Sequence, residues 1–283
     1  MPAELHCGPY RLPLDRPLIM GIINATPDSF SGDGVAFDLV RAVEQAHAFV
    51  ADGADILDIG GESTRPGAVP VGAEEEIRRV VPLIEALREL KVPLSIDTFK
   101  PEVMRAALAA GATLINDINA LRAPGAVEVA AASDAGICLM HMQGTPQTMQ
   151  DDPAYENVVA EVKAFLVERI EACRAAGIGR ERIVIDPGFG FGKTSEHNLE
   201  LLRGLDRFVA TGYPVLVGLS RKSVLGRLTG RKVTERVAAS VAAAIAAVAR
   251  GASIVRVHDV AATRDALAVW CVAAKSTLPG VAQ

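Results

Sequence analysis

Short apolar, β-rich runs alternate with Ala/Glu/Arg-rich stretches from Leu18 to the end of the chain. Most of the runs are apolar on both faces, which is typical of strands in a parallel sheet covered on both sides. The stretches between them carry apolar residues at positions i, i+3 and i+4, which predicts helices packed on that sheet. The eight runs occupy residues 18–24, 55–61, 93–98, 113–118, 137–142, 182–188, 213–220 and 253–259.

The helical stretches show start and stop signals. Gly53, Gly111 and Gly251 each follow a helical stretch and precede the next strand, as helix-terminating glycines do. Pro101 and Thr234 suit helix starts. The clearest helices are predicted at residues 39–51, 74–90, 101–110, 158–176 and 234–249.

The number and order of these units predict the fold. Eight strand–helix units in about 260 residues, with no linker between them, favour a single (β/α)8 TIM barrel of the α/β class, with residues 1–283 as one domain. A doubly wound open sheet is the alternative. Residues 1–17, which contain Gly8, Pro9 and Pro13, are expected to form a short hairpin or arm at the bottom of the barrel.

Composition excludes several classes of protein. Half of the 283 residues are hydrophobic, and 25 Gly and 16 Pro are ordinary proportions, so the chain is neither disordered nor collagen-like. The four cysteines have no CxxC spacing, which indicates idle thiols in a reducing compartment. The longest apolar run, residues 237–249, is shorter than the roughly 20 residues of a membrane span, and the N-terminus does not resemble a signal peptide. We therefore expect a cytoplasmic protein without membrane contact.

Charge bears on the partner. The net charge is −5, only 4% of residues are aromatic, and the chain has no basic run, all of which disfavours a nucleic-acid partner. An acidic protein still binds an anion where its positive groups converge locally. The expected partners are therefore small molecules.

The predicted strands turn polar over their last one to four residues. In a TIM barrel the carboxyl ends of all strands share one face, where the active site is built. A single Asp at a strand end is most often a cap or turn residue. Eight polar strand ends are harder to explain in this way, because an unpartnered buried polar group costs about 1–3 kcal/mol. We predict that a ligand or water satisfies them.

The residue types at the strand ends indicate the chemistry of that ligand. Asp97, Asn116 and Asp186 suit a flat molecule with several N–H donors along one edge, since a carboxylate accepts two such bonds side by side. Lys222 adds a donor for a carbonyl oxygen or a ring nitrogen. Asp58, within the second strand, is expected to be a hydrogen-bonded structural acid.

A second group of strand-end residues suits phosphate. Arg256 and His258 are two residues apart on one strand and should point the same way. With Thr64 and Arg65 they are expected to cradle a phosphate or pyrophosphate. Asn24 offers a neutral oxygen to a Mg²⁺ that keeps most of its waters and bridges substrate phosphates.

Two tempting motifs fail. Residues 188–194, GFGFGKT, resemble a Walker A loop, but that motif needs glycine where the chain has Pro187, and the glycine spacing is not that of the dinucleotide fingerprint. We expect a tight loop that lets backbone and two phenyl rings approach a ligand. No Cys/His cluster has the spacing of a zinc site.

Eight segments occur in order over nearly the whole chain: MGIINATPDSFSGDG, IGGESTRPGA, SIDTFKPEV, INDINAL, LMHMQGTPQTM, DPGFGFGK, GLSRKS and RVHDV. Together they resemble the dihydropteroate synthase family of the folate pathway, in its bacterial form. The resemblance implies a TIM-barrel transferase that joins 6-hydroxymethyl-7,8-dihydropterin diphosphate to 4-aminobenzoate and releases pyrophosphate. It also implies Mg²⁺ as cofactor and a homodimer, for which the Ala-rich residues 237–249 offer a face for close packing.

The resemblance assigns residues to three subsites. The pterin would contact Asp97, Asn116, Asp186 and Lys222, with Ile118, Met140 and Gly218 lining the slot. The diphosphate and Mg²⁺ would meet Asn24, Thr64, Arg65, Arg256 and His258. The aminobenzoate pocket, where sulfonamides also bind, would be formed by Ser63, Pro66, Phe191, Ser220, Arg221 and Ser223.

The catalytic residues implied are Lys222, Arg256, His258, Asp97 and Asp33. Many relatives read DSFSDGG in the first loop, where this chain reads DSFSGDG, so Asp33 stands one place later than the family's loop acid. An SN1-like path is expected, with the loops at residues 26–34 and 62–72 closing over the site. The alternatives are a pterin-dependent methyltransferase of the same barrel superfamily, a Schiff-base aldolase using Lys222, and a catalytically inactive homologue.

Overall fold

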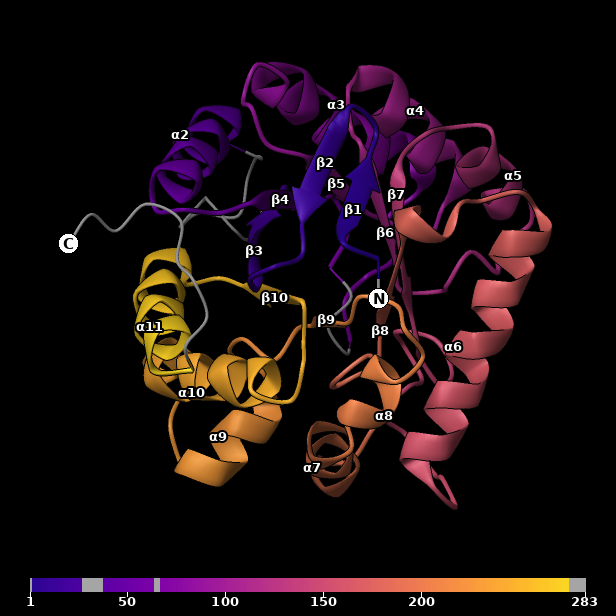
Figure 1. Ribbon diagram of the computed structural model, residues 1–283. Coiled ribbons are helices and arrows are strands. Elements are labelled where there is room, and N and C mark those ends of the chain that lie inside the picture. Colours follow the sequence, from indigo (N-terminus) through magenta and orange to yellow (C-terminus); the bar gives the residue numbers. More distant parts are fainter. Residues whose placement is uncertain (1, 27–37, 64–66, 275–283) are drawn as a thin grey trace.

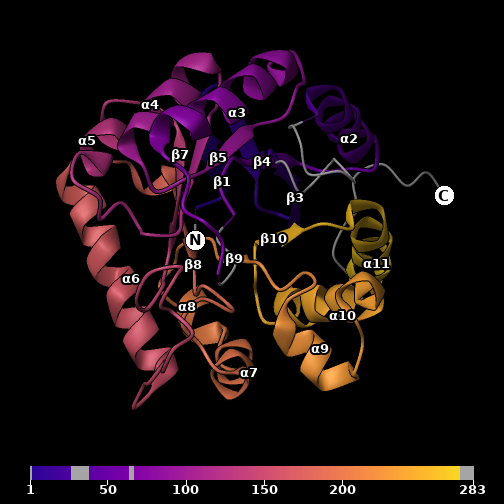
Figure 2. The same cartoon turned by 180° about the vertical axis from the view of Figure 1, so that it is seen from behind.

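Eight parallel strands curl into a barrel inside a ring of helices in the computed structural model, which describes residues 2–26, 38–63 and 67–274 (Figures 1 and 2). The strand order is β8-β7-β6-β5-β4-β3-β10-β9. A bridge between Ile185 and Val215, with a 3.0 Å bond from the Ile185 N–H to the Pro214 carbonyl, joins the two outer members and closes the barrel. The predicted TIM barrel is confirmed, and the open-sheet alternative is not. The strands are β3 (Leu18–Asn24), β4 (Ile56–Gly60), β5 (Leu94–Asp97), β6 (Leu114–Asp117), β7 (Gly136–Met140), β8 (Ile183–Asp186), β9 (Leu216–Val217) and β10 (Ile254–Val257).

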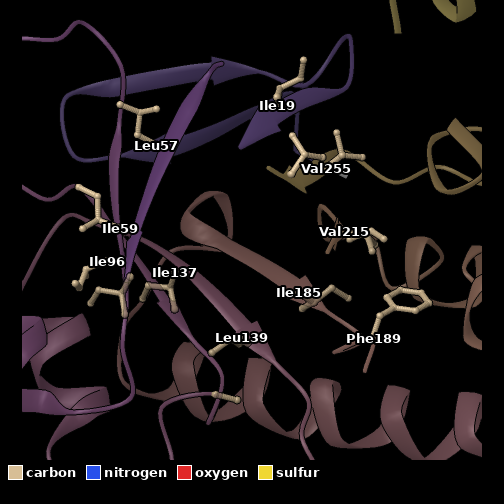
Figure 3. Close-up of a cluster of buried hydrophobic side chains, with 14 of the residues drawn as sticks. Ile19, Leu57, Ile59, Ile96, Ile137, Leu139, Ile185, Phe189, Val215 and Val255 are labelled. Carbon is tan, nitrogen blue, oxygen red and sulfur yellow. The ribbon is translucent and has the colours of Figure 1, made fainter. Parts of the chain in front are cut away.

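The alternation of side chains along each strand separates two apolar clusters. In β3, Ile19 and Ile23 belong to the larger cluster between strands and helices, whereas Leu18 and Met20 belong to a smaller one. Figure 3 shows Ile19, Leu57 and Ile96 among the larger cluster. The smaller cluster takes its residues from the first halves of the strands and fills the barrel interior at that end. Its strand members are Leu18, Met20, Ile56, Leu114, Cys138, Val184, Leu216 and Ile254.

An N-terminal hairpin seals the amino end of the barrel. Strands β1 (Glu4–Cys7) and β2 (Tyr10–Pro13) pair antiparallel, and the hairpin lies across the barrel strands in Figure 1. Leu5 and Cys7 are fully buried in the smaller cluster. Burial raises the pKa of the Cys7 thiol to about 12, so this cysteine is an apolar packing residue. The expected hairpin at the bottom of the barrel is confirmed.

Helices follow the strands where the periodicity predicted them. Side chains cap several of them: Asp38 accepts from the Arg41 N–H, and Asn157 accepts from the Ala160 N–H. The helices are α2 (Leu39–Ala51), α3 (Ala73–Leu87), α4 (Pro101–Ala110), α5 (Ala126–Ala131), α6 (Val158–Ala175), α7 (Ser195–Arg203), α8 (Asp206–Val209), α9 (Ser223–Thr229), α10 (Val237–Val248) and α11 (Val260–Ala273).

One predicted helix start is wrong. The sequence places it at Thr234, but α10 begins at Val237, after a 3₁₀ turn at Val233–Glu235. The cause is Arg236, whose Nη1 donates to the carbonyls of Arg221 and Lys222 and so fixes the chain before the helix. Among the described helices, none has both the length and the apolar composition that crossing a membrane requires.

We predict that Leu5→Ala lowers the free energy of unfolding by about 2–5 kcal/mol, because it leaves a cavity where the hairpin closes the barrel. The change lies far from the carboxyl ends of the strands, so ligand binding there should be retained. Urea unfolding measures the loss. Val40→Ala, on the exposed side of α2, is the control and should cost less than about 0.5 kcal/mol. Equal losses in the two variants would contradict a packed hairpin.

Candidate active site

Polar side chains replace the apolar ones in the second half of the barrel interior. The register places Asp97 of β5 beside Gly60 of β4 and Asn116 of β6, while Asp186 of β8 lies beside Met140 of β7. Asp97, Asn116 and Asp186 thus end neighbouring parts of one parallel sheet, as the strand-end pattern predicted. Asn24 ends β3 in register with Gly60.

Arg256 lies between two carboxylates at the centre of this polar layer. Its Nε donates to Asp58 Oδ2 at 2.5 Å, and its Nη2 donates to Asp97 Oδ2 at 2.7 Å. Burial alone lowers the pKa of the guanidinium, but Asp58 and Asp97 outweigh burial and raise it. Arg256 is therefore a permanent cation whose direction is fixed by two acids from other strands.

Asp58 connects Arg256 to the rest of the layer. The residue is fully buried, and its carboxylate also accepts from Ser95 Oγ at 2.5 Å and Asn116 Nδ2 at 3.1 Å. The expectation of a hydrogen-bonded structural acid is confirmed, yet the residue also belongs to the site. Its position in the sequence could have indicated this, because residues two apart on a strand face the same side and Asp58 stands two residues before Gly60 at the end of β4.

Asp97 keeps one oxygen without a partner. Its Oδ1 is buried and makes no hydrogen bond among the residues that the structure describes. Burial raises the pKa of Asp97 to about 7, Arg256 opposes the rise, and Asp58 adds to it. An N–H donor placed at Oδ1 would stabilise the ionised carboxylate. A buried acceptor of this kind fits a ligand that brings an N–H donor.

Lys222 and Asp186 form the second charged part of the layer. The Lys222 Nζ donates to the Phe189 carbonyl and lies 4.7 Å from the centre of the Phe191 ring. Burial lowers the pKa of Lys222 to about 8, and Asp186 opposes that shift. Burial raises the pKa of Asp186. The Lys222 charge and a 2.7 Å hydrogen bond from the Gly188 N–H oppose this rise.

Gly218 and an apolar cluster shape the space beside these charges. A Cβ on Gly218 would lie 3.9 Å from both Arg256 Cβ and Lys222 Nζ, an ordinary contact distance, so Gly218 lies between these two side chains. Ile118 and Met140 belong to a small buried cluster at the ends of β6 and β7, against which Phe191 packs. These positions are those expected to line a flat ligand.

The loop after β9 and the first residue of α9 carry the predicted Ser220, Arg221 and Ser223. Ser220 Oγ lies 3.0 Å from His258 Nδ1, so His258 faces this loop. Arg221 has φ +59° and donates to Asp259 through Nε at 3.0 Å and through Nη2 at 2.5 Å. Ser223 begins α9 and is exposed. Arg256 and His258 are thus close in sequence but have different partners.

Four predicted site residues, Asp33, Thr64, Arg65 and Pro66, lie outside the described residues. Ser63 is described and exposed at the carboxyl side of β4. Its neighbour Glu62 accepts from the Val71 N–H at 3.0 Å and from Lys100 Nζ, which also donates to Glu76 Oε2 at 2.5 Å. Sequence reasoning missed this half-buried Lys100, which fixes Glu62 before the loop.

The donors for a metal ion are few. The described residues contain no group of three His, Cys, Asp or Glu side chains placed to hold a metal. Asn24 supplies one neutral oxygen at the strand ends. This donor set fits a hard cation such as Mg²⁺ that takes its remaining ligands from water and phosphate oxygens.

Known proteins have a similar sequence and a similar barrel. Residues 20–258 match the family described as pterin binding enzyme. Dihydropteroate synthase from Haemophilus influenzae is 51% identical over 268 residues, which cover 94% of this chain and 98% of the relative. The Xanthomonas albilineans dihydropteroate synthase solved with 4-aminobenzoic acid has a TM-score of 0.91 at 54% identity, covering 98% of this chain and 100% of its own. The Burkholderia cenocepacia enzyme solved with 7,8-dihydropteroate has a TM-score of 0.89 at 55% identity over 97% of each chain.

We predict that Asp97→Asn removes a pH dependence of folding stability. Between the ordinary Asp pKa of about 4 and about 7, folded Asp97 binds a proton that the unfolded chain has released. The free energy of unfolding therefore falls as pH rises through this interval in the wild type. The amide that replaces the carboxyl group in Asp97→Asn does not titrate, so the variant should gain stability relative to the wild type between about pH 4 and about pH 7 in urea unfolding.

Asp265→Asn, on the exposed side of α11, is the control for the substitution itself. A stability difference between Asp97→Asn and wild type that stays constant over this pH interval would show that Asp97 is ionised throughout.

Proposed function

The chain belongs to the dihydropteroate synthase family of pterin-binding enzymes, and we propose that it joins 6-hydroxymethyl-7,8-dihydropterin diphosphate to 4-aminobenzoate, releasing pyrophosphate and 7,8-dihydropteroate. Enzymes of this family are transferases of folate biosynthesis. The proposal depends most on Asp97 Oδ1, which is buried and has no partner in the described part of the chain, in a layer that also holds Asp186 and Lys222.

The pterin fits the charges of the inner layer. Its ring edge carries N–H donors, for which Asp97 and Asp186 are the acceptors, and Asn116 stands beside Asp97. The Lys222 ammonium would donate to a ring oxygen or nitrogen. Ile118 and Met140 supply an apolar wall for the faces of the ring. Binding would ionise Asp97, because N–H donors favour its charged form.

The diphosphate would lie nearer the opening. Carboxylates engage Arg256 Nε and Nη2, so we assign the remaining nitrogen, Nη1, to the diphosphate. His258, Thr64 and Arg65 are assigned to the same group. Asn24 would hold a Mg²⁺, which when bound neutralises charge on the diphosphate oxygens.

The chemistry requires departure of the diphosphate before much attack occurs, because an aromatic amine is a weak nucleophile. Cationic donors stabilise negative charge as the leaving group forms, a role for Arg256 and His258. The Asp97 and Asp186 carboxylates would stabilise the positive charge that spreads into the dihydropterin. These roles give an SN1-like path: the C–O bond to the diphosphate breaks first, the amine then forms a C–N bond to the pterin cation, and the amine nitrogen releases a proton. Asp33 is assigned the role of the family's loop acid, which helps to stabilise the cation.

The aminobenzoate pocket is assigned to the loops around Lys222. The Phe191 ring lies against Lys222 Nζ in the described structure, and Ser220 and Arg221 directly precede Lys222 in the chain. Sulfonamides, which have the shape of 4-aminobenzoate, should compete at this pocket. The remaining residues assigned to it are Ser63, Pro66 and Ser223.

The test is release of pyrophosphate when the purified protein receives both substrates and Mg²⁺. We predict that Lys222→Ala and Arg256→Ala each lower kcat/KM by at least about 100-fold, the size of effect seen when one charge-stabilising donor is removed. Arg256→Ala should also destabilise the fold, because it leaves Asp58 buried without its cation.

Lys91→Ala, an exposed lysine in the loop before β5, should keep the wild-type rate. Methyl transfer to a corrinoid without pyrophosphate release would replace this proposal with the methyltransferase alternative. Near-normal kcat/KM in Lys222→Ala or Arg256→Ala would refute the role of that residue.

We also propose that residues 1–283 form one pterin-binding barrel domain, with residues 1–17 as its arm, and that the protein is a cytoplasmic homodimer. The last two helices support the dimer. On α11, Val269 and Val272 expose 72% and 67% of their surface, and α10 beside it is built almost entirely of small and apolar residues.

We predict that the double variant Val269→Glu, Val272→Glu sediments as a monomer, whereas the wild type sediments as a dimer, because four buried carboxylates across a two-fold interface repel one another. Val40→Glu, equally exposed on α2, should leave the dimer intact. A wild-type protein that sediments as a monomer would contradict the dimer. A double variant that still sediments as a dimer would show that the interface does not include this face of α11.

A further inference from the structure

Residues 188–194, the segment that resembles a Walker A loop, have an unusual pattern of hydrogen bonds. Five carbonyls in succession, from Phe189 to Lys193, each accept from a different side chain. Loop carbonyls ordinarily face water, so this number of side-chain donors indicates a segment held in one conformation. The donors, in chain order of the carbonyls, are Lys222, Gln150, Lys193, Tyr155 and Asn198.

Glycines allow the same segment to lie in close contact with the residues that follow β7. Gly188, Gly190 and Gly192 all have positive φ, and a Cβ on Gly188 would lie 1.9 Å from the His141 carbonyl oxygen. A Cβ on Gly192 would lie 2.6 Å from the Gln143 carbonyl oxygen. The glycine pattern that resembled a nucleotide loop is therefore required by contact with the neighbouring strand.

Lys193 fastens the segment from inside. Its side chain is buried, at 3% exposure, and its Nζ lies 2.8 Å from the Phe191 carbonyl oxygen, 3.0 Å from His141 Nδ1 and 3.4 Å from the His141 carbonyl oxygen. None of these partners is anionic. Burial lowers the pKa of Lys193 well below its usual value, with Asp186 opposing. A lysine in such surroundings costs stability, which indicates a positional role.

The two phenylalanines transmit that position to Lys222. Phe189 is fully buried in the main core, and its carbonyl accepts from Lys222 Nζ. The Phe191 ring lies 4.7 Å from the same Nζ, and the Phe191 carbonyl is the one that Lys193 holds. Both groups that locate the Lys222 ammonium thus belong to the segment that Lys193 ties to His141.

We propose that Lys193 is a positioning residue, which ties residues 188–194 to the end of β7 so that the Phe189 carbonyl and the Phe191 ring hold the Lys222 ammonium at the pterin site. The proposal rests on the proposed function, since it assigns Lys222 to the pterin. His141 is the anchor in this arrangement, which makes it a packing residue that faces Lys193, Tyr155 and Phe165.

A double-mutant cycle on ligand binding tests the proposal. Calorimetry measures the Kd of the dihydropterin diphosphate with Mg²⁺, without 4-aminobenzoate, for wild type, Lys193→Met, Lys222→Met and the double variant. We expect Lys193→Met alone to weaken binding about tenfold, and to add less than about twofold once Lys222 is already methionine. Equal losses in both backgrounds, or no loss in the first, would overturn the proposal.

The controls separate position from stability and from the proposed function. Lys91→Met makes the same substitution at an exposed site and should bind like wild type. If wild type itself binds no dihydropterin diphosphate, the proposed function fails and the proposal about Lys193 fails with it. Wild-type binding with additive losses rejects Lys193 alone.

Tyr155→Phe provides a gentler variant if Lys193→Met does not fold. It removes only the hydroxyl that donates to the Gly192 carbonyl at 2.8 Å and keeps the ring against His141. We expect a rise of about threefold in Kd in the wild-type background and none beside Lys222→Met. Tyr10→Phe, on the hairpin, is the matched control. A rise that persists beside Lys222→Met would overturn the proposal.

Discussion

The ion pairs that Arg256 makes with Asp58 and Asp97 are the interaction on which the site depends. They join β10 to β4 and β5 across the barrel interior, between residues 198 and 159 positions apart in the chain. One guanidinium serves two carboxylates, so the layer holds more negative than positive charge at this point. Asp97 Oδ1 has no partner among the residues that the structure describes, and burial, with Asp58 nearby, raises the pKa of this acid. A ligand rich in N–H groups would supply the donor that Asp97 Oδ1 lacks.

Much of the architecture was predictable because it follows from local patterns. Apolar runs in alternation with amphipathic stretches predicted the barrel, and the polar ends of those runs predicted that Asp97, Asn116 and Asp186 converge. This inference needs only the rule that parallel strands end on one face. The hairpin at the bottom followed from turn residues near the N-terminus.

The partners of the site residues were not predictable in the same way. Spacing placed Arg256 and His258 on one side of a strand, but Arg256 bonds to Asp58 and Asp97 while His258 faces Ser220. The partner of each side chain depends on the register between strands that are distant in the sequence, and this register cannot be read from a single sequence. Asp58 looked structural and Lys193 looked like part of a failed motif. Both are explained by burial, a property of the folded chain.

The N-terminal hairpin closes one end of the barrel. Leu5 and Cys7 are buried at this closed end, and the charged layer lies nearer the carboxyl ends of the strands. With that end closed, a molecule that binds at Asp97 would have to enter from the carboxyl ends of the strands, ahead of any molecule that binds nearer those ends. Release would follow the reverse order, because a molecule bound nearer the carboxyl ends of the strands would block the exit of the one at Asp97.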